Sequence, residues 1–385
     1  MNKIENKYIT KILFVIVMLL QLTGCTEESS PVAPVRTMNS DNPLKSALDK
    51  TVDQVLEKYY EDPEFVGVSI GIYKGGNENY YNYGETVNGG KTLPSKNTIY
   101  EIGSVSKTFT GAIMVGLINE GLLNLDQPIV NYLPNYVATQ NFGSTNVTLR
   151  TLAAHSGGFS NLPDDFLSDG YDANNPFNHY DTNKVFNYLK TNRCNYKPGS
   201  KVEYSNLGMA LVAIICSRVT NKSYEVLVKE RILNQLDMAS TRVNNSADSD
   251  PLWSTGYDDT GKRVNRITAS AFQGAGFLSS SLSDMMKYAK AQLGIGPTWV
   301  TTLMQRTQDL QFFDSSLGIG YGWDWVINPE AKNYFHDGRT PGFRSFVLFN
   351  SDSKTAIVCL FNSSGIEQNS KLEAMFYELA LSVLK

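Results

Sequence analysis

The sequence has few cysteines and few histidines. Its 385 residues include four cysteines and three histidines. His155, His179 and His336 stand far apart, with no H-x-x-x-H pair and no cysteine beside them, so no metal site is expected. Cys216 and Cys359 lie in apolar runs and are expected to be packing residues, and no disulfide framework is implied. We therefore expect the protein to work without a metal or any other cofactor.

The sequence also lacks a surplus of positive charge and, beyond its first residues, any membrane-spanning run. It has 34 lysines and arginines against 38 aspartates and glutamates, a formal net charge of −4. Because there is no basic stripe, nucleic acid is not an expected partner. The 42% hydrophobic content of this long chain is enough to bury a substantial core. Composition therefore indicates an enzyme-sized globular chain, folded as one large domain or as two closely packed lobes.

The N-terminus predicts an export signal. Three lysines precede the apolar run 12–20, which is too short to span a bilayer. The following segment, 22–25, resembles the bacterial lipobox, in which the cysteine, here Cys25, is lipidated and becomes the mature N-terminus. We expect a signal peptide over 1–24 and a flexible tether over 25–44. The protein would then be a lipoprotein of the bacterial cell envelope, anchored in the outer membrane and facing the periplasm or the outside. An ordinary secretory signal or an N-terminal anchor is the alternative.

A serine and a lysine stand three residues apart, at Ser104 and Lys107, where an extended segment is expected to give way to a helix. Apolar residues recur at helical spacing from Phe109 and stop at Gly121. On such a helix positions i and i+3 share a face, so the Lys107 amine can reach the Ser104 hydroxyl. The start of a helix also offers unpaired N–H groups and a positive dipole end, which favour developing negative charge. A partly desolvated lysine has a lowered pKa and can act as a base, so the pattern predicts a nucleophile at Ser104.

Two other serines compete with Ser104 on pattern alone. Ser351 and Lys354 repeat the spacing, but they stand between two strand-like runs and are expected to form a hairpin turn. Ser69 lies in a G-x-S-x-G pattern, which needs a strand, a sharp turn and then a helix. Here the apolar alternation continues through the pattern and a glycine turn follows. Ser69 is therefore expected to be an ordinary strand residue.

Two further motifs follow Ser104 and Lys107 in order, Tyr204-Ser205-Asn206 and His336-Asp337-Gly338. The ordered set resembles the S-x-x-K, Y-x-N and H-x-G motifs of the serine β-lactamase and penicillin-binding superfamily, in particular its class C β-lactamase and DD-peptidase/esterase branch. The resemblance runs from about residue 48 to the C-terminus. It includes the segment 232–241, in which Asp237 stands where glycine is usual.

Strand-like runs near both ends of the chain enclose a helix-rich middle. The patterns predict helices over 44–59 and 368–384, a hairpin over 66–83, and strands over 333–335, 345–350 and 356–362. This order predicts an α/β (α+β) fold, with an antiparallel sheet built from both termini, flanking helices and an inserted helical lobe. The resemblance implies the same fold. The folded domain would span 45–385, with a sheet lobe of about 45–105 and 320–385 and a helical lobe of about 106–319.

The motifs suggest a division of labour. Ser104 would attack a carbonyl and form an acyl-enzyme, while Lys107 and Tyr204 handle the proton, because the lysine can stabilise a phenolate. Asn206 can orient both Lys107 and the acyl amide of a substrate. The backbone N–H groups of Ser104 and, by resemblance, of Arg339 would hold the oxyanion.

Three more positions are expected to shape substrate binding. His336 opens the third motif, where histidine is, within the family, more typical of DD-carboxypeptidases, D-aminopeptidases and esterases than of class C β-lactamases. Gly338 would let a substrate approach the strand edge closely, and Arg339 or Arg344 could bind a substrate carboxylate. His155, in a segment that resembles another part of the family with Ala154 and Gly157 in place of threonine and serine, is expected to be a structural residue of the cleft wall.

The resemblance implies a secreted, lipid-anchored serine hydrolase. Its substrates would be small molecules or peptides, and it would cleave amide bonds in D-amino-acid peptides from the cell wall or in β-lactams. A carboxylesterase of the same fold, or a penicillin-acylated sensor that does not turn over, is the alternative.

Overall fold

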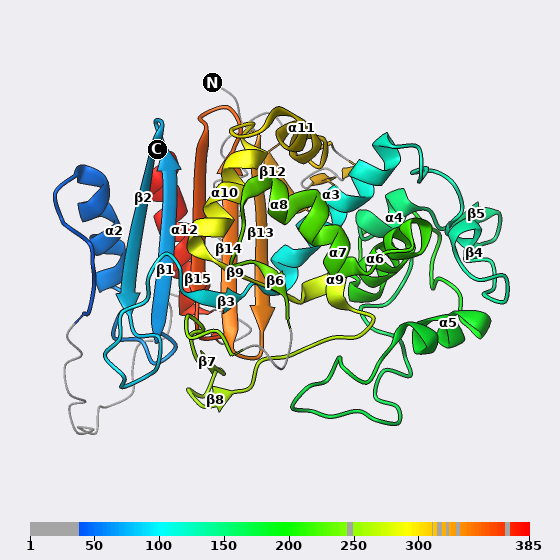
Figure 1. Cartoon of the computed structure of the whole chain (residues 1–385), viewed down its shortest axis with the longest axis horizontal. Coiled ribbons are helices and arrows are strands. Elements are labelled where there is room, and N and C mark those ends of the chain that lie inside the picture. Colours follow the sequence, from blue (N-terminus) through cyan, green and yellow to red (C-terminus); the bar gives the residue numbers. More distant parts are fainter. Residues whose placement is uncertain are drawn as a thin grey trace, which may run out of the picture. The chain divides into compact units, whose positions relative to one another are not determined.

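Figure 1 shows the fold in a computed structural model, which describes residues 38–244, 249–309, 311–313, 318–320, 323–328, 332–365 and 370–385. The predicted signal peptide, Cys25 and the tether up to residue 37 lie outside the described residues. Residues 38–385 form one compact unit, so the last residues of the predicted tether belong to it. Asn42, for example, donates from Nδ2 to the Tyr83 hydroxyl at 2.6 Å. In the described part of the chain, no helix is long and apolar enough to cross a bilayer.

The large sheet is built from both ends of the folded unit (Figure 1), which confirms the predicted fold class. Its antiparallel strands run in the order β10-β11-β12-β13-β14-β15-β1-β2. They are β1 (Gly67–Lys74), β2 (Asn77–Gly84), β10 (Phe312–Phe313), β11 (Gly318–Gly320), β12 (Trp323–Asn328), β13 (Asn333–Thr340), β14 (Phe343–Asn350) and β15 (Thr355–Phe361). The sheet therefore includes strands from Phe312 onward, earlier than the predicted boundary near 320.

Helices cover both faces of this sheet because its strands are apolar on both faces. Helices α2 (Ala47–Glu57) and α12 (Lys371–Leu384) pack against Ile70 and Ile72 of β1 on one face. Helix α10 (Leu282–Gln292) packs on the other face, where Gly71 makes room for it. A Cβ at Gly71 would lie 2.5 Å from the Met286 sulfur.

The remaining helices form the helical lobe. They are α3 (Ser106–Asn119), α4 (Leu149–Ala153), α5 (Thr182–Thr191), α6 (Asn206–Thr220), α7 (Tyr224–Val228), the π-turn η3 (Lys229–Leu233), α8 (Asn234–Leu236), α9 (Gln273–Gly276), α11 (Thr298–Arg306) and the 3₁₀ turn η2 (Ile129–Tyr132). Helices α3 and α6 are apolar on all sides and buried over most of their length, as expected for helices at the centre of a lobe.

Three short sheets complete the fold. The first joins β3 (Ile99–Glu101), β9 (Leu278–Ser281) and β6 (Arg242–Val243), and the other two are the hairpins β4 (Asn141–Phe142) with β5 (Thr145–Asn146) and β7 (Gly256–Tyr257) with β8 (Arg263–Val264). The first of these sheets places the end of β3 next to the start of α3.

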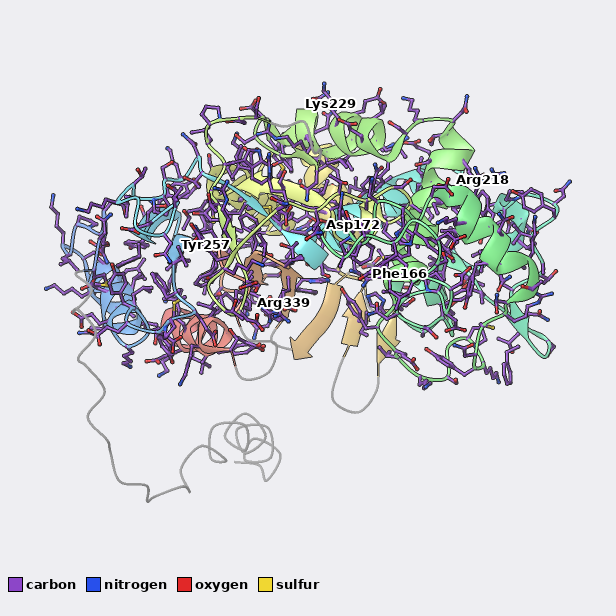
Figure 2. All side chains as sticks on the ribbon, turned by 90° about the horizontal axis from the view of Figure 1, so that it is seen from below. Phe166, Asp172, Arg218, Lys229, Tyr257 and Arg339 are labelled. Atoms are coloured by element: carbon purple, nitrogen blue, oxygen red, sulfur yellow. The ribbon has the colours of Figure 1, made fainter. Side chains whose placement is uncertain are left out.

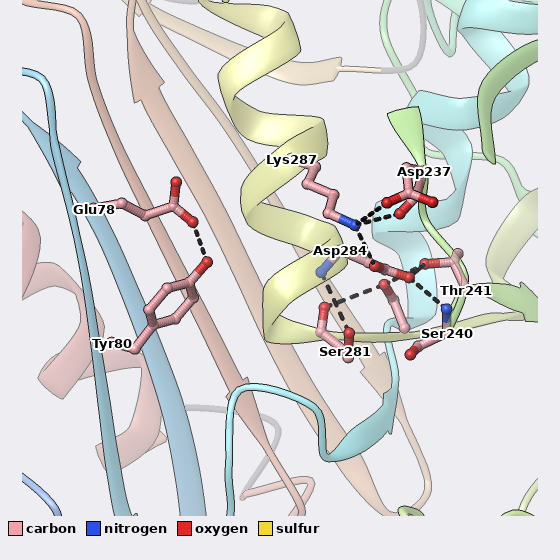
Figure 3. A network of polar contacts seen from close by, with 9 residues as sticks. Glu78, Tyr80, Asp237, Ser240, Thr241, Ser281, Asp284 and Lys287 are labelled. Carbon is pink, nitrogen blue, oxygen red and sulfur yellow. Dashed lines mark hydrogen bonds and ion pairs between the residues drawn. The ribbon is translucent and has the colours of Figure 1, made fainter. Parts of the chain in front are cut away.

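A polar network fastens the turn after α8 to helix α10 (Figure 3). The Asp284 carboxylate accepts from the Ser240 N–H at 2.8 Å and from the Thr241 hydroxyl at 2.9 Å. Lys287 donates to the main-chain oxygen of Asp237. Asp237 has φ 53°, in the left-handed region that favours glycine, which explains why the family usually has glycine at this position.

Candidate active site

Ser104 lies in a 3₁₀ turn, η1 (Gly103–Val105), that leads directly into α3. Gly103 has φ 49°, and a Cβ there would lie 2.6 Å from the backbone nitrogen of Arg339 on β13. The Ser106 hydroxyl donates to the Gly103 carbonyl at 2.7 Å and accepts from the Leu278 N–H at 3.0 Å. The turn is therefore held between β9 and β13, with Ser104 half-buried at its surface.

Lys107 is fully buried beside Ser104. Its Nζ donates to Ser104 Oγ at 3.0 Å, to Asn206 Oδ1 at 2.7 Å and, at closer range, to the main-chain oxygen of Ala275. An ammonium group has three donors, and here three acceptors from three different segments meet them. The structure thus brings Ser104, Lys107 and Asn206 together.

Tyr204 completes the cluster from the start of α6. Its hydroxyl donates to Ser104 Oγ at 2.6 Å, and its ring centroid lies 4.7 Å from Lys107 Nζ. Ser205, between Tyr204 and Asn206, is the N-cap of α6 and accepts from the Gly208 N–H at 2.9 Å. The cap fixes where α6 begins. Tyr204 and Asn206, which flank the capping Ser205, are thereby both held next to Ser104 and Lys107.

His336 is buried in this structure. Its side chain lies in β13 with none of its surface exposed. Its Nδ1 donates to the carbonyl oxygen of Asp337 at 2.6 Å, because a carbonyl can only accept. The role of His336 in substrate binding stays a prediction.

Gly338 is required by close packing. A Cβ at Gly338 would lie 2.0 Å from the carbonyl oxygen of Ile102 and 2.5 Å from the Ser345 hydroxyl. The glycine therefore lets β13 pack against the backbone that leads into the nucleophile turn, and its predicted role at the strand edge toward substrate stays a prediction.

Arg344 cannot serve as a binding group for a substrate carboxylate. It stands directly opposite Arg339 in the β13–β14 register, on the face of the sheet away from Gly338. Its guanidinium pairs with Asp337 at 2.8 Å and with Glu373 at 3.2 Å. The Arg339 guanidinium donates to the main-chain oxygen of Gly365 at 2.9 Å, and of the two arginines only Arg339 lines the cleft.

A cleft of about 460 Å³ opens in front of Ser104. One wall of the cleft is apolar and includes Phe177. The Phe177 ring packs against Phe166, which is labelled in Figure 2, with 5.1 Å between the ring centroids. The polar lining residues are Ser104, Asn206, Asp258, Asp259, Arg339, Thr340 and Ser364. Sequence reasoning missed both the apolar wall and the two aspartates. The aromatic-rich stretch 166–180 was a signal for the wall, and no motif marked Asp258 and Asp259. In the described residues, no group of three or more His, Cys, Asp or Glu side chains could hold a metal ion.

A family model described as Beta-lactamase matches residues 52–382. The chain belongs to the beta-lactamase family. This confirms the resemblance seen in the motifs, and the described site of this beta-lactamase-family protein holds the first two of them in contact.

Relatives of known name lie at low identity. The protein is 26% identical over 334 residues to Protein flp of Staphylococcus aureus (strain N315). This alignment covers 83% of the present chain but only 64% of the length of Protein flp. It is 26% identical over 296 residues to a beta-lactamase of Pseudomonas fluorescens, covering 76% and 78% of the two chains.

Solved structures show the same fold. A beta-lactamase/D-alanine carboxypeptidase from Pseudomonas syringae superposes with a TM-score of 0.75 at 23% identity, over 87% of this chain and 99% of that one. A class C beta lactamase from Rhodobacter sphaeroides gives 0.74 at 21% identity, over 87% and 100%. At these identities the likeness establishes the fold.

His155, predicted to be a structural residue of the cleft wall, is buried in this beta-lactamase-family protein. Its side chain is 2% exposed and lies against Tyr204, with 4.6 Å between the two ring centroids. The structure thus places His155 next to the residue that contacts Ser104.

Glu101 is a buried carboxyl group under the nucleophile turn, which sequence reasoning passed over. Its Oε1 accepts from the Ile267 N–H at 2.9 Å and from Asn244 Nδ2 at 3.4 Å. Burial raises the pKa of the Glu101 carboxyl to about 7, because the lowering effects of the Thr340 hydroxyl, the Ile267 N–H and Arg266 do not offset desolvation. Ile267 and Thr340 both line the cleft, so this carboxyl lies directly behind its wall.

The raised pKa predicts a pH-dependent stability that Glu101→Gln removes. The folded protein binds this proton more tightly than the unfolded chain, so the free energy of unfolding should fall as pH rises from 4.5 to about 7. The fall should be about 3 kcal/mol, and the contribution is constant above that range. Urea unfolding of both proteins at pH 5, 6, 7 and 8 would measure it. As pH rises, the free energy of unfolding of Glu101→Gln should increase relative to that of the wild type. A difference that stays constant with pH would refute the raised pKa of Glu101.

Proposed function

We propose that this protein is a serine hydrolase that forms an acyl-enzyme at Ser104 and acts on amide bonds of D-amino-acid peptides or β-lactams. The observation that carries the proposal is the contact of Ser104 Oγ with both Lys107 Nζ and the Tyr204 hydroxyl, at 3.0 and 2.6 Å. A serine hydroxyl is a weak nucleophile until a neighbouring group takes its proton. Both neighbours here can exchange protons.

The reactive form of the Lys107–Tyr204 pair has one proton fewer, as a Tyr204 phenolate that the Lys107 ammonium stabilises. In the first half of the reaction, Ser104 Oγ bonds to the substrate carbonyl carbon while its proton passes to this phenolate. The carbonyl oxygen becomes an oxyanion, which the backbone N–H groups of Ser104 and Arg339 would stabilise. The close packing of β13 on the turn, marked by the 2.6 Å from a Cβ at Gly103 to Arg339 N, supports this pairing. The bond to the leaving group then breaks as the pair returns the proton to it.

In the second half, a water molecule attacks the acyl carbon and gives a proton to the same pair; the bond from the acyl carbon to Ser104 Oγ then breaks as the pair returns that proton to Oγ. Asn206 accepts from Lys107 through Oδ1, which leaves its amide N–H₂ to bind the acyl side of the substrate. No cofactor takes part in either half.

A carboxylesterase is the second candidate, and one observation favours it. Arg339 is the only cation among the described residues that line the cleft, and its guanidinium is held by Gly365, while Asp258 and Asp259 add negative charge. Such a lining disfavours a substrate carboxylate relative to a neutral ester.

We also propose that the protein is secreted and lipid-anchored at Cys25, in the outer membrane. The basic residues, short apolar run and lipobox-like segment of the first 25 residues support this. Cell-wall fragments would then be within reach of the enzyme.

Intact mass spectrometry of the purified protein, incubated with benzylpenicillin or with an aryl acetate, tests the function. A stable adduct mapped to Ser104 would support acylation by the penicillin and a peptidase or sensor role. Rapid loss of the penicillin without an adduct would indicate β-lactamase activity, and turnover of the ester alone would favour the esterase. A protein that neither gains mass nor consumes either compound would overturn the proposal.

A further inference from the structure

His155 contacts three consecutive residues around the reactive tyrosine. Its main-chain oxygen accepts from the Glu203 N–H at 2.7 Å, and its Nδ1 accepts from the Ser205 N–H at 3.2 Å. Its ring lies against the Tyr204 ring, with 4.6 Å between centroids and 31° between planes. The residue before Tyr204, Tyr204 itself and the residue after it are thus all held by one histidine.

The contact with Ser205 fixes the state of the imidazole. A backbone N–H can only donate, so Nδ1 must be the unprotonated ring nitrogen.

The backbone at His155 is in a sparsely populated conformation. Its φ is 53°, in the left-handed region that costs a side-chain-bearing residue free energy. The following residues hold the chain in place, since the Ser156 carbonyl accepts from the Gly199 N–H at 2.8 Å and the Gly158 carbonyl from the Asn195 N–H at 2.6 Å. These hydrogen bonds fix the backbone of the segment 155–158, which contacts the residues on either side of Tyr204.

We propose that His155 is a positioning residue, which holds the Tyr204 phenol at the distance and angle needed to exchange a proton with Ser104. It does so through the paired backbone contacts and through its ring, and it touches neither substrate nor Ser104. The inference rests on the proposed function, because it assigns a task within that reaction.

Two substitutions separate the contacts that His155 makes. His155→Asn keeps an acceptor near the position of Nδ1 and tolerates the left-handed backbone, but it removes the ring. His155→Phe keeps a ring and removes the acceptor. Ser160→Ala is the matched control. Ser160 lies two residues after the segment 155–158, and the substitution removes the contact of its Oγ with Asn195 Nδ2 at 2.8 Å.

Two readouts follow for each variant. We expect the maximal rate of Ser104 acylation by benzylpenicillin to fall roughly tenfold in both His155 variants, with the half-saturating concentration little changed. In ¹³C-tyrosine NMR, the Tyr204 ring signal, identified by its loss in Tyr204→Phe, should show faster ring flipping in both. Ser160→Ala should match the wild type in both readouts.

A purely structural role would lower the melting temperature of the His155 variants and leave acylation per folded molecule and ring flipping unchanged, which would overturn the proposal. If the wild type is not acylated, the proposed function fails. The Tyr204 ring-flip rate measured by NMR then tests by itself whether His155 positions Tyr204. Unchanged ring flipping in both variants would then reject it.

Discussion

Lys107→Met is expected to lower the rate of Ser104 acylation by about 10³-fold or more while leaving the fold intact. The amine contacts Ser104 Oγ, Asn206 Oδ1 and the Tyr204 ring at once. Methionine has a similar length and no charge, so the lower acylation rate would reflect the missing amine and not a change in packing. Because a buried ammonium group is costly to desolvate, the melting temperature should change little or rise. Single-turnover acylation followed by mass, together with thermal unfolding, would measure both effects.

The chain supplies its own matched control for this substitution. Ser351 and Lys354 have the same spacing as Ser104 and Lys107, and they lie in the turn between β14 and β15, as predicted. Lys354 Nζ donates to the Leu293 carbonyl at 2.8 Å and has no part in the cleft. Lys354→Met should acylate at the wild-type rate. A Lys107→Met protein that acylates within tenfold of the wild type would remove Lys107 from the mechanism.

Gly338→Ala is expected to lower the free energy of unfolding by about 3 kcal/mol or more. The added methyl group would meet the Ile102 carbonyl at 2.0 Å and the Ser345 hydroxyl at 2.5 Å, and these two atoms already share a hydrogen bond of 2.8 Å. Ile102 has little room to move, because its own N–H donates to the Leu278 carbonyl at 3.0 Å. The clash must therefore separate β13 from the nucleophile turn. Urea unfolding would measure the loss of stability.

A second glycine gives the comparison for Gly338. Gly116 lies within α3, where a Cβ would meet nothing nearer than Arg231 Nη1 at 3.5 Å. Gly116→Ala should be neutral or raise stability by up to about 1 kcal/mol, because alanine loses less backbone entropy in a helix. Equal effects of the two substitutions would show that close packing at Gly338 is not what requires the glycine.

Local patterns were enough to predict several of the main elements, though not the strands β10, β11 and β12 of the sheet. The alternation around Ser69 gave a strand, and the structure places Ser69 in β1, where its hydroxyl donates to Asn82 Oδ1 at 2.7 Å. The periodic apolar residues after Lys107 gave a helix, which is α3. Period-two and period-3.6 patterns reflect which side of an element is buried, and so they can be read without knowing the partner.

The third motif shows what such patterns cannot predict, namely the contacts that each side chain makes in the folded protein. Its residues His336, Gly338 and Arg339 were all predicted to face the substrate, whereas the structure buries His336 and packs Gly338 against Ile102. The alternation of side chains in β13 is fixed by the strand, but Gly338 packs against Ile102, which lies more than 200 residues earlier in the sequence. The sequence contains no local signal for that.

The sequence by itself determined the fold class, the family and the order of Ser104, Lys107 and Tyr204, because each is encoded in short patterns of residue type and spacing. Only the tertiary structure decided that Arg344 pairs with Asp337 and Glu373, that a carboxyl group, Glu101, is buried behind the cleft, and that His155 supports Tyr204. These contacts join residues from 7 positions apart, Asp337 and Arg344, to 166 positions apart, Glu101 and Ile267. Their energies arise from desolvation and close packing, which exist only once the chain has folded.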